Sequence, residues 1–203
     1  MRRHAAILVF DGVEVLDFAG PFEVFAVTDE LQQHRLLHTF TVAEAPGTVR
    51  AVNGLKLTPD YLLEAAPAPA VLVVPGGAGT RALLKRPALL EWVRGRAARA
   101  EVVMSVCTGA LVLARAGLLA GLRVTTHHEC LDELRALAPG ATVDPARRFH
   151  DNGRILTAAG ITAGIDCALH VVERLFGAET ADRTMRYMEY GRHAQPADTP
   201  APP

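Results

Sequence analysis

Short, continuously apolar segments alternate along the chain with longer segments of helical periodicity, and this alternation restricts the fold more than any other feature. Several apolar segments have no polar face, which is typical of strands buried on both sides, and they span residues 5–10, 39–45, 70–75, 101–106 and 123–127. Amphipathic helices are expected between them, at residues 20–31, 80–99, 108–119 and 130–138. The series predicts a doubly wound, flavodoxin-like α/β fold, with helices on both faces of a mostly parallel sheet.

Two Asn-Gly dipeptides interrupt this rhythm. Each is flanked by extended residues, at 49–59 and 149–160, and this pattern is typical of β-hairpins. We therefore expect short antiparallel strands beside the parallel core, and two further helices at 163–177 and 179–191. With 203 residues, half of them hydrophobic, the chain is predicted to form one domain over residues 1–194 and a Pro-rich tail over 195–203.

Composition argues against several classes of partner. The net charge is −1 and basic residues are scattered, so we expect no nucleic-acid partner. No apolar stretch reaches the ~18 to 20 residues that span a bilayer, so we expect no membrane insertion. The three cysteines lack the spacing of a disulfide framework, and no cleavage site follows the first apolar run. These observations predict a cytoplasmic protein without disulfides.

Cys107 lies between the apolar strand 101–106 and the start of a helix. Such a strand-turn-helix lifts a reactive atom to the sheet edge where open α/β sheets bind ligands, and Gly109 leaves room for the turn. We expect a strained backbone at Cys107, and a thiol pKa lowered by the helix N-terminus. Cys130 and Cys167 fall inside helical patterns and are expected to pack as small apolar residues.

A glycine-rich loop follows the strand at 70–75. The backbone N–H groups of Gly76 and Gly77, with that of Thr108, could form a cradle for an anion or a substrate. The same loop matches the dinucleotide fingerprint G-x-G-x-x-A through Gly77, Gly79 and Ala82. We disfavour that alternative because the fingerprint belongs to the first strand-helix turn, whereas this turn is a later one.

Three further side chains are candidates for the same edge. Asp17, after the first strand, could act as an acid or base or could cap the first helix. Glu23 could serve in the site or be a surface carboxylate, and His127 could assist the cysteine or be a hydrogen-bonded rim histidine. Although His127, His128 and Cys130 lie close in sequence, they lack a second spaced pair of ligands, so no metal site is expected.

Four motifs together resemble the DJ-1/PfpI superfamily, which has a class I glutamine amidotransferase-like sandwich fold. They are LDFAGPFEVF, VVPGGAGT, SVCTGALVLARAGLLAGLRVTTH and AAGITAGIDCALHVVERLFG, and the similarity runs from about residue 5 to 190. Within the superfamily the chain is most similar to isonitrile hydratases and to the ligand-binding domains of AraC-type regulators.

The resemblance implies an enzyme that adds water to a small-molecule isocyanide, giving an N-substituted formamide, without metal or organic cofactor. Its Cys nucleophile, Asp and Thr fall on Cys107, Asp17 and Thr108, while Gly76, Gly77, Glu23 and His127 are expected to contact the substrate. Asp17 replaces the Glu of DJ-1-like members. This chain departs from the hydratases at His128, where they carry Trp, and in its C-terminal segment. A homodimer is implied by resemblance as well.

Two alternatives remain open on the same residues. One is a glyoxalase or deglycase-like enzyme that uses Cys107 with Glu23 or His127. The other is a non-catalytic small-molecule-binding module, related to the sensing domains of AraC-type regulators. Those regulators continue into a helix-turn-helix region, where this chain has only the Pro-rich tail, so we do not expect it to bind DNA.

Overall fold

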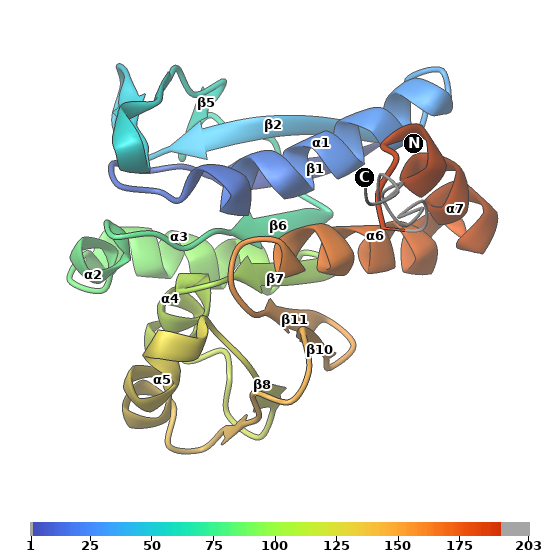
Figure 1. Ribbon diagram of the computed structural model, residues 1–203. Helices are drawn as coiled ribbons and strands as arrows, with labels where there is room; N and C mark the ends of the chain where they lie inside the picture. The colour runs from blue at the N-terminus through green and yellow to red at the C-terminus, as the bar shows by residue number, and fades with distance from the viewer. Residues whose placement is uncertain (1, 192–203) are drawn as a thin grey trace, which may run out of the picture.

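The computed structural model describes residues 2–191 as helices arranged around a central sheet (Figure 1). The sheet has seven strands in the order β10-β11-β7-β6-β1-β2-β5, and every described pairing in it is parallel except β10 with β11. Its strands are β1 (Arg3–Leu8), β2 (Leu37–Ala43), β5 (Tyr61–Leu62), β6 (Val71–Val74), β7 (Val102–Val106), β10 (Phe149–Asp151) and β11 (Ile155–Ala158). The predicted fold class is confirmed.

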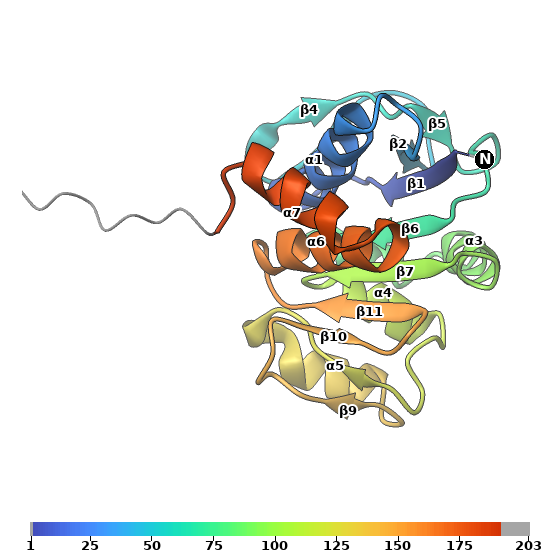
Figure 2. The same ribbon diagram turned by 90° about the vertical axis from the view of Figure 1, so that its right-hand side faces the viewer.

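The helices form two packed groups, one in front of the sheet and one behind it in Figure 1. The front group comprises α1 (Val15–Leu31), α6 (Ala163–Phe176) and α7 (Ala178–Tyr187). The other comprises α2 (Thr80–Leu83), α3 (Pro87–Ala97), α4 (Gly109–Arg115) and α5 (Leu131–Leu137), with a short 3-10 helix at His128–Cys130 beside α5. A second 3-10 helix, Val52–Gly54, lies near the start of α1, where the Val52 N–H donates to the Val13 carbonyl at 2.9 Å. Figure 2 shows α1, α6 and α7 side by side along one face of the strands.

The chain direction explains why helices cover both faces. It moves from β1 outward to β2 through α1, then returns to β6 on the other side of β1 and continues outward through β7 to β11. Because parallel crossovers are right-handed, this reversal places the two sets of connecting helices on opposite faces. The strands β1, β6, β7 and β11 are parallel, so the loops that follow them all emerge at one edge of the sheet. The reversal between β1 and β6 marks the place on this edge where such folds bind ligands.

Several predicted elements differ in their bounds. The expected helix over 80–99 is two helices, because Arg86 precedes Pro87 and is extended, with φ −112° and ψ 90°. The expected strand at 123–127 is only β8 (Arg123–Val124), which pairs with β9 (Thr142–Val143) in a separate small sheet. The first helix begins at Val15, with Glu14 at its N-cap, so Asp17 is not the capping residue.

Both predicted hairpins are present. β3 (Val49–Arg50) and β4 (Lys56–Leu57) pair antiparallel across a turn in which Asn53 has φ 63° and Gly54 φ 88°. β10 and β11 pair antiparallel across the second Asn-Gly, where Gly153 has φ 82°. These positive φ values explain why the first turn uses Asn53 and Gly54 and why the second uses Gly153. No helix in residues 2–191 is long and apolar enough to cross a membrane, and the predicted tail at 195–203 lies outside the described residues.

Candidate active site

Cys107 occupies the sharp turn between β7 and α4. Its φ of 54° lies in the left-handed region, so the predicted backbone strain is confirmed. The Cys107 N–H donates to the carbonyls of Ala158 and Ala159, at 3.2 and 2.9 Å, and its carbonyl accepts from the Thr126 hydroxyl at 2.8 Å. These hydrogen bonds tie the turn to the end of β11 and hold the strained conformation in place.

Gly109 lets the turn approach the neighbouring strand. A Cβ atom at this position would lie 1.9 Å from the carbonyl oxygen of Val74, at the end of β6. Real Cβ atoms essentially never come closer than 3.0 Å to such an atom, so a larger residue would push α4 away from the sheet. The expectation that Gly109 makes room for the turn is confirmed.

The loop after β1 is joined to the loop after β6, and this junction places Asp17. The Glu14 N–H donates to the Gly76 carbonyl at 2.9 Å, and the Gly79 N–H donates to the Gly12 carbonyl at 3.1 Å. Asp17, in the first turn of α1, is fully buried, and its Oδ2 accepts from the Gly76 N–H at 3.0 Å. Its other carboxyl oxygen, Oδ1, is buried without a hydrogen-bond partner.

The Asp17 carboxyl and the Cys107 thiol influence each other. Burial, assisted by the nearby Glu14 charge, raises the pKa of Asp17 to about 7, although hydrogen bonds from Gly76 and Cys107 oppose the rise. Burial and the Asp17 charge raise the pKa of the Cys107 thiol to about 12, against smaller opposing contributions from the Thr108 N–H and hydroxyl. The expectation of a lowered thiol pKa is therefore wrong, because the loss of hydration outweighs the hydrogen bonds from Thr108, the N-cap residue of α4.

Thr108 is held by the glycine loop. Its hydroxyl oxygen accepts from the Gly77 N–H at 2.9 Å and lies 2.9 Å from the hydroxyl oxygen of Thr80. A Cβ atom on Gly76 would lie 2.5 Å from the Thr108 backbone nitrogen, so only glycine fits there. The N–H groups of Gly76 and Gly77, predicted to cradle the substrate, are instead bonded to Asp17 and Thr108. The loop positions the site's side chains from within the protein.

His127 lies at the rim of the site, beside the loop that follows β11. A Cβ atom on Gly160 would lie 2.6 Å from its Cδ2, which shows that the ring packs directly on the Gly160 backbone. Its Nδ1 accepts from the Glu129 N–H at 3.3 Å, and its ring stacks on His128 with the centroids 4.3 Å apart. This backbone hydrogen bond agrees with the interpretation of His127 as a hydrogen-bonded rim histidine. The structure gives His127 no hydrogen bond to the Cys107 thiol.

Glu23 is not brought to the thiol by any described contact. It lies six residues beyond Asp17 on α1, which turns its side chain about 120° away from that of Asp17. It is exposed, whereas Asp17 is fully buried. The structure therefore favours the interpretation of Glu23 as a surface carboxylate, and the glyoxalase alternative loses one of its two proposed partners.

Three features of the site were missed in the sequence. Thr80 is fully buried against Thr108, and Thr126 holds the Cys107 carbonyl. Ile161, two residues after Ala159, has φ 48°, an outlier for a β-branched residue. Thr80 and Thr126 stand inside the motifs GGAGT and TTH, but only the fold shows that Thr80 contacts Thr108 and that Thr126 contacts Cys107.

A separate hollow of about 220 Å³ opens at the carboxyl ends of β1 and β2, lined by residues that include Phe10, Asp11 and Arg86. Its lining contains neither Cys107 nor Asp17. We place the candidate active site at Cys107, because the reactive side chains gather there.

Comparison with known proteins decides the family. The pattern of the DJ-1/PfpI family matches residues 3–174. The chain belongs to the DJ-1/PfpI family. It is 38% identical over 202 residues to isonitrile hydratase from Pseudomonas putida, covering 100% of this chain and 84% of the hydratase. Among solved structures, a ThiJ/PfpI family protein from Pseudomonas syringae superposes with a TM-score of 0.84 at 31% identity, over 100% of this chain and 78% of the other.

The chain is also similar to part of a transcriptional regulator. HTH-type transcriptional regulator GbdR from Pseudomonas aeruginosa is 29% identical over 185 residues, covering 91% of this chain and 50% of the regulator. This chain thus spans about half the length of that relative. The chain therefore resembles both a hydratase and part of a transcriptional regulator.

Proposed function

We propose that this protein is an isonitrile hydratase that uses Cys107 as nucleophile and Asp17 as proton carrier. The observation that carries the proposal is the buried pair of these two side chains, with one carboxyl oxygen of Asp17 left without a partner. Similarity to isonitrile hydratase over the whole chain supports the same activity.

The first half of the reaction joins the thiol to the isocyanide, R–N≡C. Asp17 accepts the thiol proton while the sulfur attacks the terminal carbon, and the carboxyl then delivers that proton to the same carbon. The product is a thioimidate, R–N=CH–S–Cys107. Because sulfur and hydrogen add to one carbon, a protonated thiol beside a carboxyl that titrates near pH 7 is a suitable resting state.

The second half releases the product. Water adds to the thioimidate carbon, and one of its protons passes to the nitrogen, with Asp17 or Thr108 orienting the water. The carbon–sulfur bond then breaks, the hydroxyl proton returns to the sulfur, and R–NH–CHO leaves. These steps regenerate the neutral thiol and require no metal or organic cofactor.

The test is formamide formation from a panel of small isocyanides. Cys107→Ala and Asp17→Asn should each lower turnover by at least ~10²-fold, since general acid–base catalysis alone contributes 10²- to 10⁴-fold. The matched control is Cys130→Ala, which should keep wild-type turnover, and circular dichroism verifies folding. Wild-type protein that turns over no isocyanide would contradict the proposal, as would full activity of the Cys107→Ala variant.

A binding module is the second candidate, favoured by the similarity to GbdR. Such a module would bind a small molecule without consuming it. Calorimetric binding of an isocyanide or another small ligand, without product formation, would support this alternative over the hydratase.

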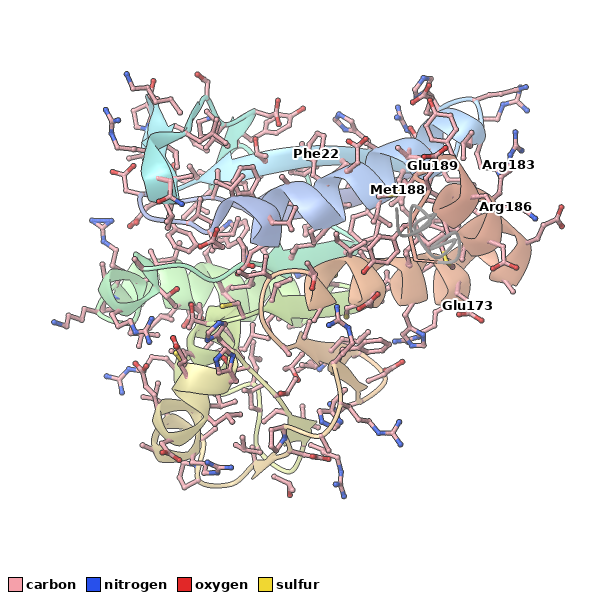
Figure 3. All side chains as sticks on the ribbon, viewed as in Figure 1. Phe22, Glu173, Arg183, Arg186, Met188 and Glu189 are labelled. Carbon is pink, nitrogen blue, oxygen red and sulfur yellow. The ribbon has the colours of Figure 1, made fainter. Side chains whose placement is uncertain are left out.

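We also propose that the protein acts as a homodimer through α1. This helix is apolar around most of its circumference, and Val15, Ala19, Phe22 and Ala26, spaced for one helix face, are all only half-buried. Figure 3 shows Phe22 on α1, while the charged Arg183 and Arg186 of α7 project at one end of the molecule. An apolar stripe of this kind on a surface helix is typical of a protein–protein interface.

A further inference from the structure

Thr80, in α2, is a fully buried residue to which the proposed reaction assigns no role. Its hydroxyl oxygen lies 2.6 Å from the Gly77 carbonyl oxygen and 2.9 Å from the hydroxyl oxygen of Thr108. Thr108 in turn follows Cys107 in the chain, and its hydroxyl lowers the pKa of the Cys107 thiol. Thr80 therefore stands one hydrogen bond away from a hydroxyl that influences the ionisation of the reacting sulfur.

Counting protons fixes the direction of these hydrogen bonds. A carbonyl can only accept, so the single hydroxyl proton of Thr80 goes to the Gly77 carbonyl, and the Thr80 oxygen must accept from Thr108. In the alternative arrangement the Thr108 hydroxyl would donate to the Gly77 carbonyl. That bond is 3.4 Å long, whereas the bond from the Thr80 hydroxyl to the same carbonyl is 2.6 Å, so the Thr80 bond is favoured. The Gly77 N–H occupies one lone pair of the Thr108 oxygen.

The Thr108 hydroxyl proton thus has competing acceptors. The Thr80 oxygen lies 2.9 Å and the Gly77 carbonyl oxygen 3.4 Å from the Thr108 oxygen, and the third acceptor is the Cys107 sulfur, where a hydrogen bond from Thr108 favours the thiolate. Rotation about the Cβ–Oγ1 bond of Thr108 moves the proton from one acceptor to another. While the Thr108 hydroxyl proton is bonded to the Thr80 oxygen, it does not stabilise the thiolate, so ionisation of the Cys107 thiol is disfavoured.

We propose that Thr80 is a positioning residue that holds the Thr108 hydroxyl proton away from the Cys107 sulfur until the thiol has given its own proton to Asp17. This inference rests on the proposed function, in which the sulfur and its proton add to one carbon. When the S–H bond breaks and the Asp17 O–H bond forms, the Thr108 hydroxyl turns to the sulfur and stabilises the new charge. The only other covalent change in this step is formation of the bond between the sulfur and the isocyanide carbon.

Alkylation of Cys107 by iodoacetamide at pH 9 tests the inference without any isocyanide. All variants carry Cys130→Ala, which removes the other accessible cysteine. Cys167 is fully buried and should not react, and mass spectrometry verifies that the label is on Cys107. Thr80→Val keeps the shape but removes the competing acceptor, so alkylation should be about 2- to 10-fold faster, as expected for loss of one net hydrogen bond. Thr80→Ser should restore the original rate. The Thr80 N–H still bonds the Gly77 carbonyl at 3.1 Å in either variant.

Two controls separate this role from a merely structural one. The first control is Thr28→Val, which removes a hydroxyl from another buried threonine pair, in which the Thr28 and Thr184 hydroxyl oxygens lie 2.9 Å apart. Thr28 lies about 16 Å along α1 from Asp17, so this change should leave the alkylation rate unchanged. In a Thr108→Val background, Thr80→Val should have no further effect. Unchanged or slower alkylation in folded Thr80→Val would overturn the inference, as would equal acceleration without the Thr108 hydroxyl. If Thr80→Val does not fold, Thr80→Ala serves for the same comparison.

Because alkylation needs no substrate, its result is independent of isocyanide turnover. A positive result with no formamide formed would retain the role of Thr80 and reject only the hydratase proposal.

Discussion

Asp17 combines complete burial with a missing hydrogen bond, and this combination makes it costly to keep ionised. Burial is the largest cause of its raised pKa, and Oδ1 has no donor to offset the lost hydration. A carboxyl that served only the fold would be expected to find partners for both oxygens. At the scale of the residue, the site therefore gives up stability in order to hold a carboxyl that can exchange protons near neutral pH.

This cost predicts a pH dependence of stability. As the pH rises from about 4 to 7, the folded protein retains an Asp17 proton that the unfolded chain releases, so the free energy of unfolding falls. A shift from 3.8 to about 7 corresponds to roughly 4 kcal/mol at most. Asp17→Asn should therefore gain stability relative to wild type between pH 5 and pH 8, in thermal or denaturant unfolding.

Glu23→Gln, on the same helix but exposed, is the matched control and should follow the wild-type profile. A difference between wild type and Asp17→Asn that is constant from pH 5 to pH 8 would show that Asp17 does not titrate in this range.

At the scale of the element, the site depends on how closely the start of α4 approaches the end of β6. Gly109→Ala should destabilise the protein by about 1 to 3 kcal/mol or more, because its Cβ would meet the Val74 carbonyl at 1.9 Å. Gly95→Ala is the matched control, since a Cβ on Gly95, within α3, meets nothing within 4 Å. That change should stabilise the helix by roughly 0.5 to 1 kcal/mol.

Urea unfolding of the two alanine variants measures both effects. Equal stability changes for Gly109→Ala and Gly95→Ala would contradict the packing argument, since the two substitutions differ only in what surrounds the new methyl group.

Helices, strands and turns with strong local patterns could be predicted from the sequence. The strands and side chains that they pair with could not, because those residues lie far away along the chain. The buried strands β6 and β7, the Asn-Gly hairpins and the turn at Cys107 each follow from residues close in sequence. The strand predicted at 123–127 shows this limit. Its apolar residues indicate a strand but not its partner, and β8 pairs with β9 in a separate sheet instead of joining the main one. The same limit applies to Gly76 and Gly77, whose N–H groups were correctly placed at the site edge but bond to Asp17 and Thr108, residues 59 and 31 positions away.

At the scale of the whole molecule, the surface of α1 that faces away from the sheet is apolar. α1 presents the apolar stripe of Val15, Ala19, Phe22 and Ala26, while its opposite side is buried against the sheet and α6. The same helix carries Asp17, the proposed proton carrier, in its first turn. A second protomer that covers the apolar stripe would therefore pack on the helix that positions Asp17. Dimerisation and the site are therefore expected to share one helix.

Phe22→Arg tests this arrangement. The wild-type protein should have the mass of a dimer in size-exclusion chromatography with light scattering, and the variant should dissociate at least ~30-fold more readily, because a central aromatic anchor contributes about 2 kcal/mol or more. Phe22 is half-buried, so a charge there can reach solvent in a monomer and the fold should survive. Leu55→Arg, at a large apolar residue that is 49% exposed and lies outside α1, should leave the mass unchanged. A monomeric wild type, or a Phe22→Arg variant that stays dimeric at micromolar concentration, would show that the stripe on α1 is not the interface.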